Sequence, residues 1–323
     1  ITEIRGHFGG FEITVDGFAI PKPSSRASLA FEAGRNGVGL QSDIILDLSG
    51  GDPLIEAGEM RDGYFRPDPG NPAAVQKALF DASDLVGEFD KTLYVTFHEN
   101  LCAHSRSTVT GCTRCLDVCP ASAITPAGDH VSIDPHICGG CGACASVCPT
   151  GAASYALPPG EVLLLRLRTL LRTYAGAGGA DAVLLVHDTR FGDEMIGMMS
   201  RFGRGLPARV LPFAVNEVTQ LGLDFFVAAV AYGANRVLVL VPPARRDEMA
   251  ALEAQIEYTE AALTGLGYGT GRIDLIEEQD PDRVAEILYD TETMATIAPA
   301  DFLPMGGKRD ITALALDHLY KNA

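Results

Sequence analysis

Cysteine is absent from most of this 323-residue chain, because all eight cysteines lie between positions 102 and 148. No secretion signal precedes them, since the chain begins Ile1-Thr2-Glu3, without a charged region followed by an apolar one. In a long chain of this kind, confined cysteines argue against a disulfide scaffold. We therefore expect a reducing, cytoplasmic location. The chain does not begin with Met, so the sequence allows for an upstream segment that has been lost.

The chain also lacks basic clusters, since no run of five or more Lys or Arg residues occurs. It has 42 acidic and 25 basic residues, and its formal net charge is −17. Such a charge repels nucleic acid and acidic membrane surfaces, and it favours a protein partner that presents a basic patch. A membrane span is not expected either, because the most apolar stretch, residues 221–241, is interrupted by Asp224, Asn235 and Arg236.

What the chain has instead is a dense cysteine pattern. Its second half runs Cys138-x2-Cys141-x2-Cys144-x3-Cys148-Pro149, and this is the spacing with which cysteines ligate cubane iron–sulfur clusters. In such a run, the first three cysteines bind one cluster and the fourth binds the other cluster of a pair. The spacing therefore groups Cys138, Cys141 and Cys144 with Cys119. It assigns Cys148 to the first cluster.

The first half of the pattern is irregular. Cys112-x2-Cys115-x3-Cys119-Pro120 keeps the last three positions, but the place three residues before Cys112 is taken by Val109. We expect residues 103–111 to be an inserted loop, so that the first [4Fe-4S] cluster is bound by Cys102, Cys112, Cys115 and Cys148. If Cys102 is not a ligand, three cysteines remain and the prediction becomes a three-iron cluster.

Cysteine, histidine and glycine-rich segments also occur in other kinds of site. Cys-x2-Cys pairs also build zinc ribbons, but a ribbon has no use for the third cysteine and the Cys-Pro ending. His98, His104 and His136 are expected to be exposed or capping residues, because the thiolates already provide eight ligands. The glycine-rich segments 265–271 and 306–309 lack the order or residues of phosphate-binding loops and are predicted as ordinary loops.

The rest of the chain divides around the cysteines into an N-terminal α/β region, residues 1–90, a cysteine domain, 91–157, and a C-terminal α/β domain, 158–323. In the first region a helix is expected at 72–89, with Asn71 as its N-cap. Predicted strands at 93–97 and 130–133 precede the two cysteine runs and make an internal repeat. In the last region, predicted strands alternate with helices, which indicates a doubly wound, mostly parallel sheet. The strands are expected at 182–187, 208–213, 236–241 and 272–276, and the helices at 161–174, 191–202, 215–232, 244–263 and 281–288.

Residues 93–156 resemble a bacterial-type ferredoxin domain with two [4Fe-4S] clusters. The resemblance implies two pseudo-symmetric β-hairpins with short helices around the clusters, and low-potential electron transfer. The expected fold class is thus α/β with an inserted α+β ferredoxin-like domain. Cys102-Ala-His-Ser-Arg-Ser107, with residues 204–210, also resembles ferredoxin-type proteins associated with bacterial formate dehydrogenases. Residues 222–224 and 233–239 are faintly similar to the small iron–sulfur subunit of methyl-viologen-reducing hydrogenases.

These observations predict an electron-transfer protein with two [4Fe-4S] clusters that serves a partner oxidoreductase such as formate dehydrogenase. No nucleophile–base pair stands out, so catalytic residues are not assigned and enzymatic activity of its own stays open. One alternative is an assembly or maturation factor that carries clusters to a dehydrogenase. Another is the electron-input subunit of a flavin- or nucleotide-binding oxidoreductase.

Overall fold

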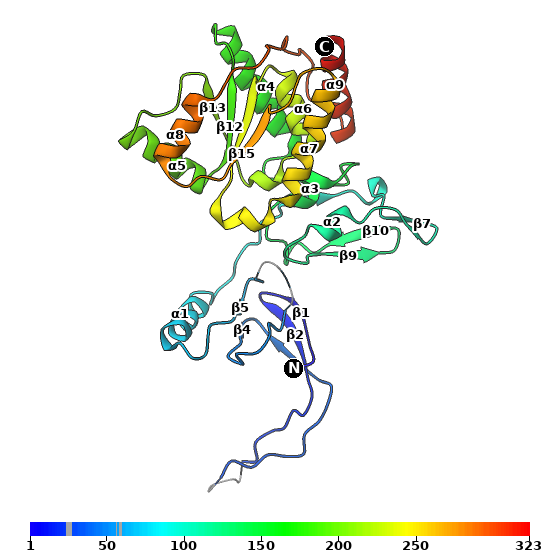
Figure 1. Ribbon diagram of the computed structural model, residues 1–323. Coiled ribbons are helices and arrows are strands. Elements are labelled where there is room, and N and C mark those ends of the chain that lie inside the picture. The colour runs from blue at the N-terminus through cyan, green and yellow to red at the C-terminus, as the bar shows by residue number, and fades with distance from the viewer. Residues whose placement is uncertain (24–27, 56, 58–59) are drawn as a thin grey trace. The chain divides into compact units, whose positions relative to one another are not determined.

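The computed structural model describes residues 1–23, 28–55, 57 and 60–323. These residues form two compact units, and Figure 1 shows the course of the chain through their elements. The first unit comprises Ile1–Thr92, Pro120–Ala123 and Asp134–Gly139. The second comprises Leu93–Cys119, Ile124–Ile133 and Gly140–Ala323.

The first unit is built on a small antiparallel sheet. β1 (Glu3–His7) pairs with β2 (Gly10–Val15), which also pairs with β3 (Val38–Ser42). β4 (Ile45–Leu46) and β5 (Tyr64–Phe65) form a short parallel pair. The buried side chains of Phe11, Ile45 and Tyr64 make a core that is small for a region of this length.

The helix α1 (Pro72–Ser83) of this unit begins as predicted. Asn71 caps it, because its side chain accepts hydrogen bonds from the backbone N–H groups of Ala73 and Ala74. The prediction that the helix continues to Phe89 is wrong. Val86 is 83% exposed and Gly87 has a φ of 154°, which lies outside the helical region. A last turn that buries so little apolar surface is not held in place by tertiary packing.

The cysteines of the second unit lie among short elements. β6 (Val95–Phe97) pairs antiparallel with β11 (Ala153–Tyr155), and β9 (Ile124–Ala127) pairs with β10 (His130–Ile133). A third hairpin joins β7 (Ser105–Arg106) to β8 (Val109–Thr110). Two short helices lie within the cysteine runs: α2 (Arg114–Asp117) contains Cys115, and α3 (Ala143–Val147) contains Cys144. Strands therefore lie at both predicted positions ahead of the runs.

The C-terminal part of this unit contains a four-stranded parallel sheet. Its strands are β12 (Val183–Asp188), β13 (Val210–Val215), β14 (Arg236–Leu240) and β15 (Ile273–Ile276), in the order β13-β12-β14-β15. All six residues of β12 are buried, as expected for a strand covered on both faces. Leu184 and Val186 pack on one face of the sheet, and Val183 and Leu185 pack on the other.

Helices cover both faces of this sheet (Figure 1). On one side lie α4 (Gly160–Gly176), α6 (Leu223–Ala231), α7 (Ala250–Gly265) and α9 (Lys308–Lys321). On the other side lie α5 (Phe191–Phe202) and α8 (Pro281–Asp290). No helix among the described residues is long and apolar enough to cross a membrane.

Two predicted helices are interrupted in the structure. The segment 215–232 contains a 3₁₀ turn, η2 (Val218–Gln220), then an extended Gly222 that begins α6. The segment 244–263 likewise divides into η3 (Pro243–Glu248) and α7. The loop predicted at 306–309 is shorter than expected, because Lys308 already begins α9. The first interruption places Gln220 and its neighbours against the cysteine segment.

Candidate functional site

Four of the predicted ligands line one small cavity of the second unit. Cys102 follows η1 (Glu99–Leu101), Cys112 follows β8, Cys115 lies within α2, and Cys148 follows α3. The rest of the wall is largely apolar and includes Phe97, Val131 and Ala152. The structure thus brings together cysteines that are up to 46 positions apart, counting from 102 to 148.

The electrostatics of these thiols reflect their proximity. Burial, together with the nearby thiols of Cys148, Cys112 and Cys102, raises the pKa of Cys115 to about 11. Burial acts in the same direction on Cys148, but its pKa is lowered overall by hydrogen bonds from the Ala153 backbone and from Thr150. The Sγ atom of Cys148 lies 3.6 Å from Oγ1 of Thr150. The pKa of Cys148 is therefore shifted in the direction opposite to that of Cys115.

The insertion after Cys102 is held by a buried histidine. His104 is 6% exposed, and its Nδ1 atom lies 2.9 Å from the carbonyl oxygen of Cys112. The backbone carbonyl of His104 accepts hydrogen bonds from the N–H groups of Gly111 and Cys112, at 2.7 and 3.3 Å. The intervening residues form the β7–β8 hairpin, which turns at Ser107 and Thr108 with positive φ. This bonding closes the chain on itself and returns Cys112 to the cavity that Cys102 lines.

The three histidines near the cysteines have different surroundings. His104 is a buried capping residue rather than an exposed one. His98 and His136 are exposed, and the ring of His136 stacks on His7 with 4.4 Å between ring centroids.

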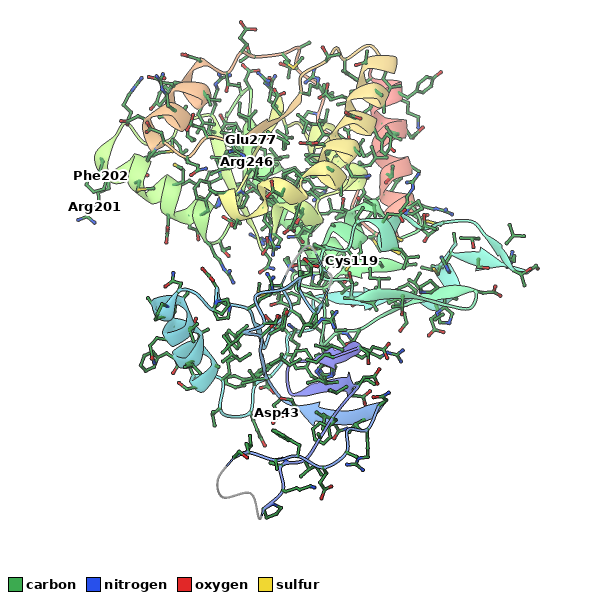
Figure 2. All side chains as sticks on the ribbon, turned by 60° about the horizontal axis from the view of Figure 1, so that its bottom comes forward. Asp43, Cys119, Arg201, Phe202, Arg246 and Glu277 are labelled. Atoms are coloured by element: carbon green, nitrogen blue, oxygen red, sulfur yellow. The ribbon has the colours of Figure 1, made fainter. Side chains whose placement is uncertain are left out.

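The other four cysteines are divided between the two compact units. Cys119, labelled in Figure 2, packs with Cys144 in a buried apolar group. Burial raises the pKa of Cys141 to about 12, and Cys119 is among the charges that raise it. Cys138 belongs to the first unit, where its backbone N–H donates to the Asp134 carbonyl at 3.0 Å.

Two glycines in the second cysteine run have positive φ angles. Gly140 and Gly142 have φ angles of 84° and 80°, a region that favours glycine. A Cβ atom on Gly140 would lie 2.7 Å from ring atoms of Tyr94, and one on Gly142 would lie 2.6 Å from Cβ of Gln220. Both positions are therefore closed to larger residues by backbone conformation and by packing.

A segment of the C-terminal sheet region holds this cysteine loop in place. Oγ1 of Thr219 donates to the Cys141 carbonyl at 2.5 Å. The hydroxyl of Tyr155 donates to the Gly140 carbonyl at 2.6 Å and accepts from Nδ2 of Asn216, also at 2.6 Å. Burial raises the pKa of Tyr155, so its hydroxyl remains a donor. No local sequence pattern indicates these contacts, because Thr219 lies 78 residues from Cys141.

The thiol arrangement suits a polynuclear group. Among residues 1–23, 28–55, 57 and 60–323, no three or more His, Cys, Asp or Glu side chains form a group that could hold a single metal ion. Cys102, Cys112, Cys115 and Cys148 instead surround a cavity, which an iron–sulfur cluster requires because each thiolate binds a different iron. The apolar wall keeps water away from such a group.

Comparison with protein-family models matches residues 110–152 to a 4Fe-4S dicluster domain. The matched segment contains every cysteine except Cys102 and covers a minor part of the chain. No curated protein and no solved structure matches the chain. The family match supports an iron–sulfur, ferredoxin-type domain in this segment with at least one [4Fe-4S] cluster.

Proposed function

We propose that this protein carries two [4Fe-4S] clusters and relays single electrons to or from a partner oxidoreductase, with formate dehydrogenase as the expected partner. The family match supports an iron–sulfur electron-transfer role. The observation that carries the two-cluster proposal furthest is the shared cavity of Cys102, Cys112, Cys115 and Cys148. Those cysteines are the ligands assigned to the first cluster, and Cys102 lies outside the matched segment.

The second cluster is assigned to Cys119, Cys138, Cys141 and Cys144. Support for this set comes from the spacing of the second run and from the influence of Cys119 on the pKa of Cys141. The positive φ angles of Gly140 and Gly142 support it as well, because such a backbone can turn its N–H groups toward an anionic cluster.

We further propose an α/β fold with an inserted α+β ferredoxin-like domain at residues 91–157, between regions 1–90 and 158–323. The pairing of β6 with β11 supports this boundary, because it joins the beginning of the cysteine segment to its end. The strand order β13-β12-β14-β15, with helices on both faces, supports a doubly wound C-terminal domain.

When bound, the clusters supply one-electron redox chemistry at low potential. The residues of the chain supply the ligands and the environment. The thiols bind iron as thiolates, and the side chains of Phe97 and Val131 exclude water from the first site. Hydrogen bonds from Thr219 and Tyr155 to carbonyl groups fix the loop that carries Cys141. The net charge of −17 favours a partner with a basic docking surface.

The proposal is tested on protein purified without oxygen. We expect about eight iron and about eight acid-labile sulfide atoms per chain, and two reversible low-potential signals in electron paramagnetic resonance. Replacement of Cys102 by alanine should convert the first cluster to a three-iron form or remove it, and leave the second signal intact. Zinc in place of iron, or an unchanged spectrum for Cys102→Ala, would contradict these assignments.

The same material distinguishes electron transfer from cluster delivery. An electron carrier should cycle between redox states with formate dehydrogenase while its iron content stays constant. Loss of iron and sulfide to an apo-dehydrogenase during the incubation would indicate an assembly factor instead.

A further inference from the structure

Gln220 carries a buried amide that has no partner in the described part of the chain. Its side chain is 7% exposed, and its Nε2 atom is buried without a hydrogen bond. An unpaired buried donor is rare in folded proteins, because the group has lost its water without gaining another acceptor. This atom therefore indicates an acceptor that a protein chain alone does not supply.

The position of Gln220 restricts where that acceptor lies. Gln220 ends the turn η2, next to Thr219, whose hydroxyl binds the Cys141 carbonyl. The Cβ atom of Gln220 lies so close to Gly142 that a methyl group on Gly142 would clash with it. Gly142 is located between Cys141 and Cys144 in the second run. The unpaired amide is thus on the side chain that packs against this loop.

Three carbonyl groups of this loop already accept hydrogen bonds. The Gly140 carbonyl accepts from Tyr155, and the Cys141 carbonyl accepts from Thr219. The Gly142 carbonyl accepts from the N–H groups of Ala145 and Ser146, at 3.0 and 3.1 Å. Sulfur atoms are further acceptors on this loop: those of the cysteines and of the cluster proposed to bind there. Sulfur atoms of iron–sulfur clusters accept N–H hydrogen bonds, and these bonds set the reduction potential.

We propose that the Gln220 side-chain amide donates a hydrogen bond to a sulfur of the second cluster and raises the reduction potential of that cluster. The inference rests on the proposed function, since it requires a cluster at Cys141 and Cys144. Reduction adds one negative charge to the cluster, so a fixed donor stabilises the reduced state more than the oxidised state. Gln220 would thus contact the cluster directly, although it belongs to the C-terminal region and lies outside the ferredoxin-type segment.

The test measures both reduction potentials of the whole protein by potentiometric titration with paramagnetic resonance detection. In Gln220→Leu we expect about a tenfold fall in the equilibrium constant for reduction of one cluster, which is ~59 mV for a one-electron couple. The other potential should not move. Gln220→Glu keeps the side-chain size and replaces the donor by a carboxylate, so it should lower the same potential at least as far.

A matched control is provided by a second buried glutamine. Gln255 on α7 is 6% exposed, and its Oε1 atom accepts from the Leu223 N–H at 3.3 Å, so this amide has a partner within the protein. Gln255→Leu should leave both potentials unchanged, which separates hydrogen bonding to the cluster from general loosening of the domain.

The outcomes separate the two proposals. If both Gln220 variants keep two clusters with unchanged potentials, the hydrogen bond does not exist and the amide faces the neighbouring cavity of about 390 Å³, which Gln220 also lines. If the unaltered protein holds only the first cluster, the second-cluster assignment itself fails. A shift of equal size in Gln255→Leu would also overturn the inference.

Discussion

His104 shows how a single buried side chain can set the geometry of an inserted loop. The insertion separates Cys102 from Cys112, and Nδ1 of His104 lies 2.9 Å from the Cys112 carbonyl. A hydrophobic residue at this position would leave that carbonyl without its side-chain partner. The cost of such a loss in a buried site is about 1–3 kcal/mol, which exceeds the usual effect of a surface substitution.

We therefore expect His104→Leu to lower the free energy of unfolding by about 1–3 kcal/mol and to speed iron loss from the first cluster. Denaturant unfolding and the rate of iron release to a chelator measure the two effects. His98→Leu is the control, because His98 is exposed and its side chain makes no capping hydrogen bond. Equal behaviour of the two variants would show that His104 does not hold the insertion.

At this scale the sequence predicts more of the ligands than of their surroundings. The spacing of the cysteines predicts seven of them as ligands, because cluster geometry requires particular separations along the chain, and Cys102 is predicted only as the nearest remaining cysteine. Thr219, Asn216 and Gln220 could not be found in this way. Asn216 bonds to Tyr155 across 61 residues, and Thr219 bonds to Cys141 across 78 residues. No spacing rule in the sequence links residues that are so far apart.

Among the elements, α9 is joined to the cysteine segment through the side chain of its first residue. Nζ of Lys308, at the beginning of α9, donates to the carbonyls of Ala145 and Ser146 at 2.8 and 2.6 Å. These carbonyls are in the last turn of α3, where a cation is favourable. Asp224 lies 3.4 Å from the same ammonium group and balances its charge.

We expect Lys308→Met to destabilise the second unit by about 1–3 kcal/mol, because two buried carbonyls lose a charged donor. Thermal unfolding of the cluster-loaded protein measures this effect. Lys321→Met, in the last turn of the same helix, should change stability by at most about 0.5 kcal/mol. Lys321 forms an exposed i,i+4 ion pair with Asp317. A larger effect at Lys321 than at Lys308 would contradict the proposed link between α9 and α3.

Strands were easier to predict than helix boundaries, for a physical reason. A buried parallel strand is a short apolar run, so the predicted strand at residues 182–187 matches β12 within a residue. Helix 191–202 matches α5, whose apolar residues recur with helical spacing. The helix expected at 215–232 fails at Gly222, where contact with the cysteine loop decides the backbone conformation. Tertiary contact outweighs helix propensity there.

For the whole molecule, the dominant electrostatic property is the net charge of −17. Such a field attracts cations and repels anions over a Debye length of about 30 Å at 0.01 M salt, which shrinks to about 3 Å at 1 M. Long-range attraction acts on encounter rates more than on the bound state. The salt dependence of electron transfer therefore reports how this charge guides a partner.

We expect the reduced protein to be oxidised by a cationic cobalt complex roughly tenfold faster at low salt than at high salt. An anionic acceptor such as ferricyanide should show the opposite trend, and a neutral quinone should show little change. Stopped-flow absorbance of the clusters measures all three rates. A salt-independent rate with the cationic complex would show that the charge does not guide the encounter.

The hydrogen bonds of Thr219 and Asn216 that hold the cysteine loop in place also bear on the order of events during translation. A ribosome that adds about 5–20 residues per second needs roughly 4–16 seconds to travel the 78 residues from Cys141 to Thr219. Once Cys148 has been made, the nascent chain offers all eight thiols without the Thr219 side chain that later binds the Cys141 carbonyl. Iron and sulfide can thus be delivered before Thr219 is translated and its hydrogen bond to the Cys141 carbonyl forms.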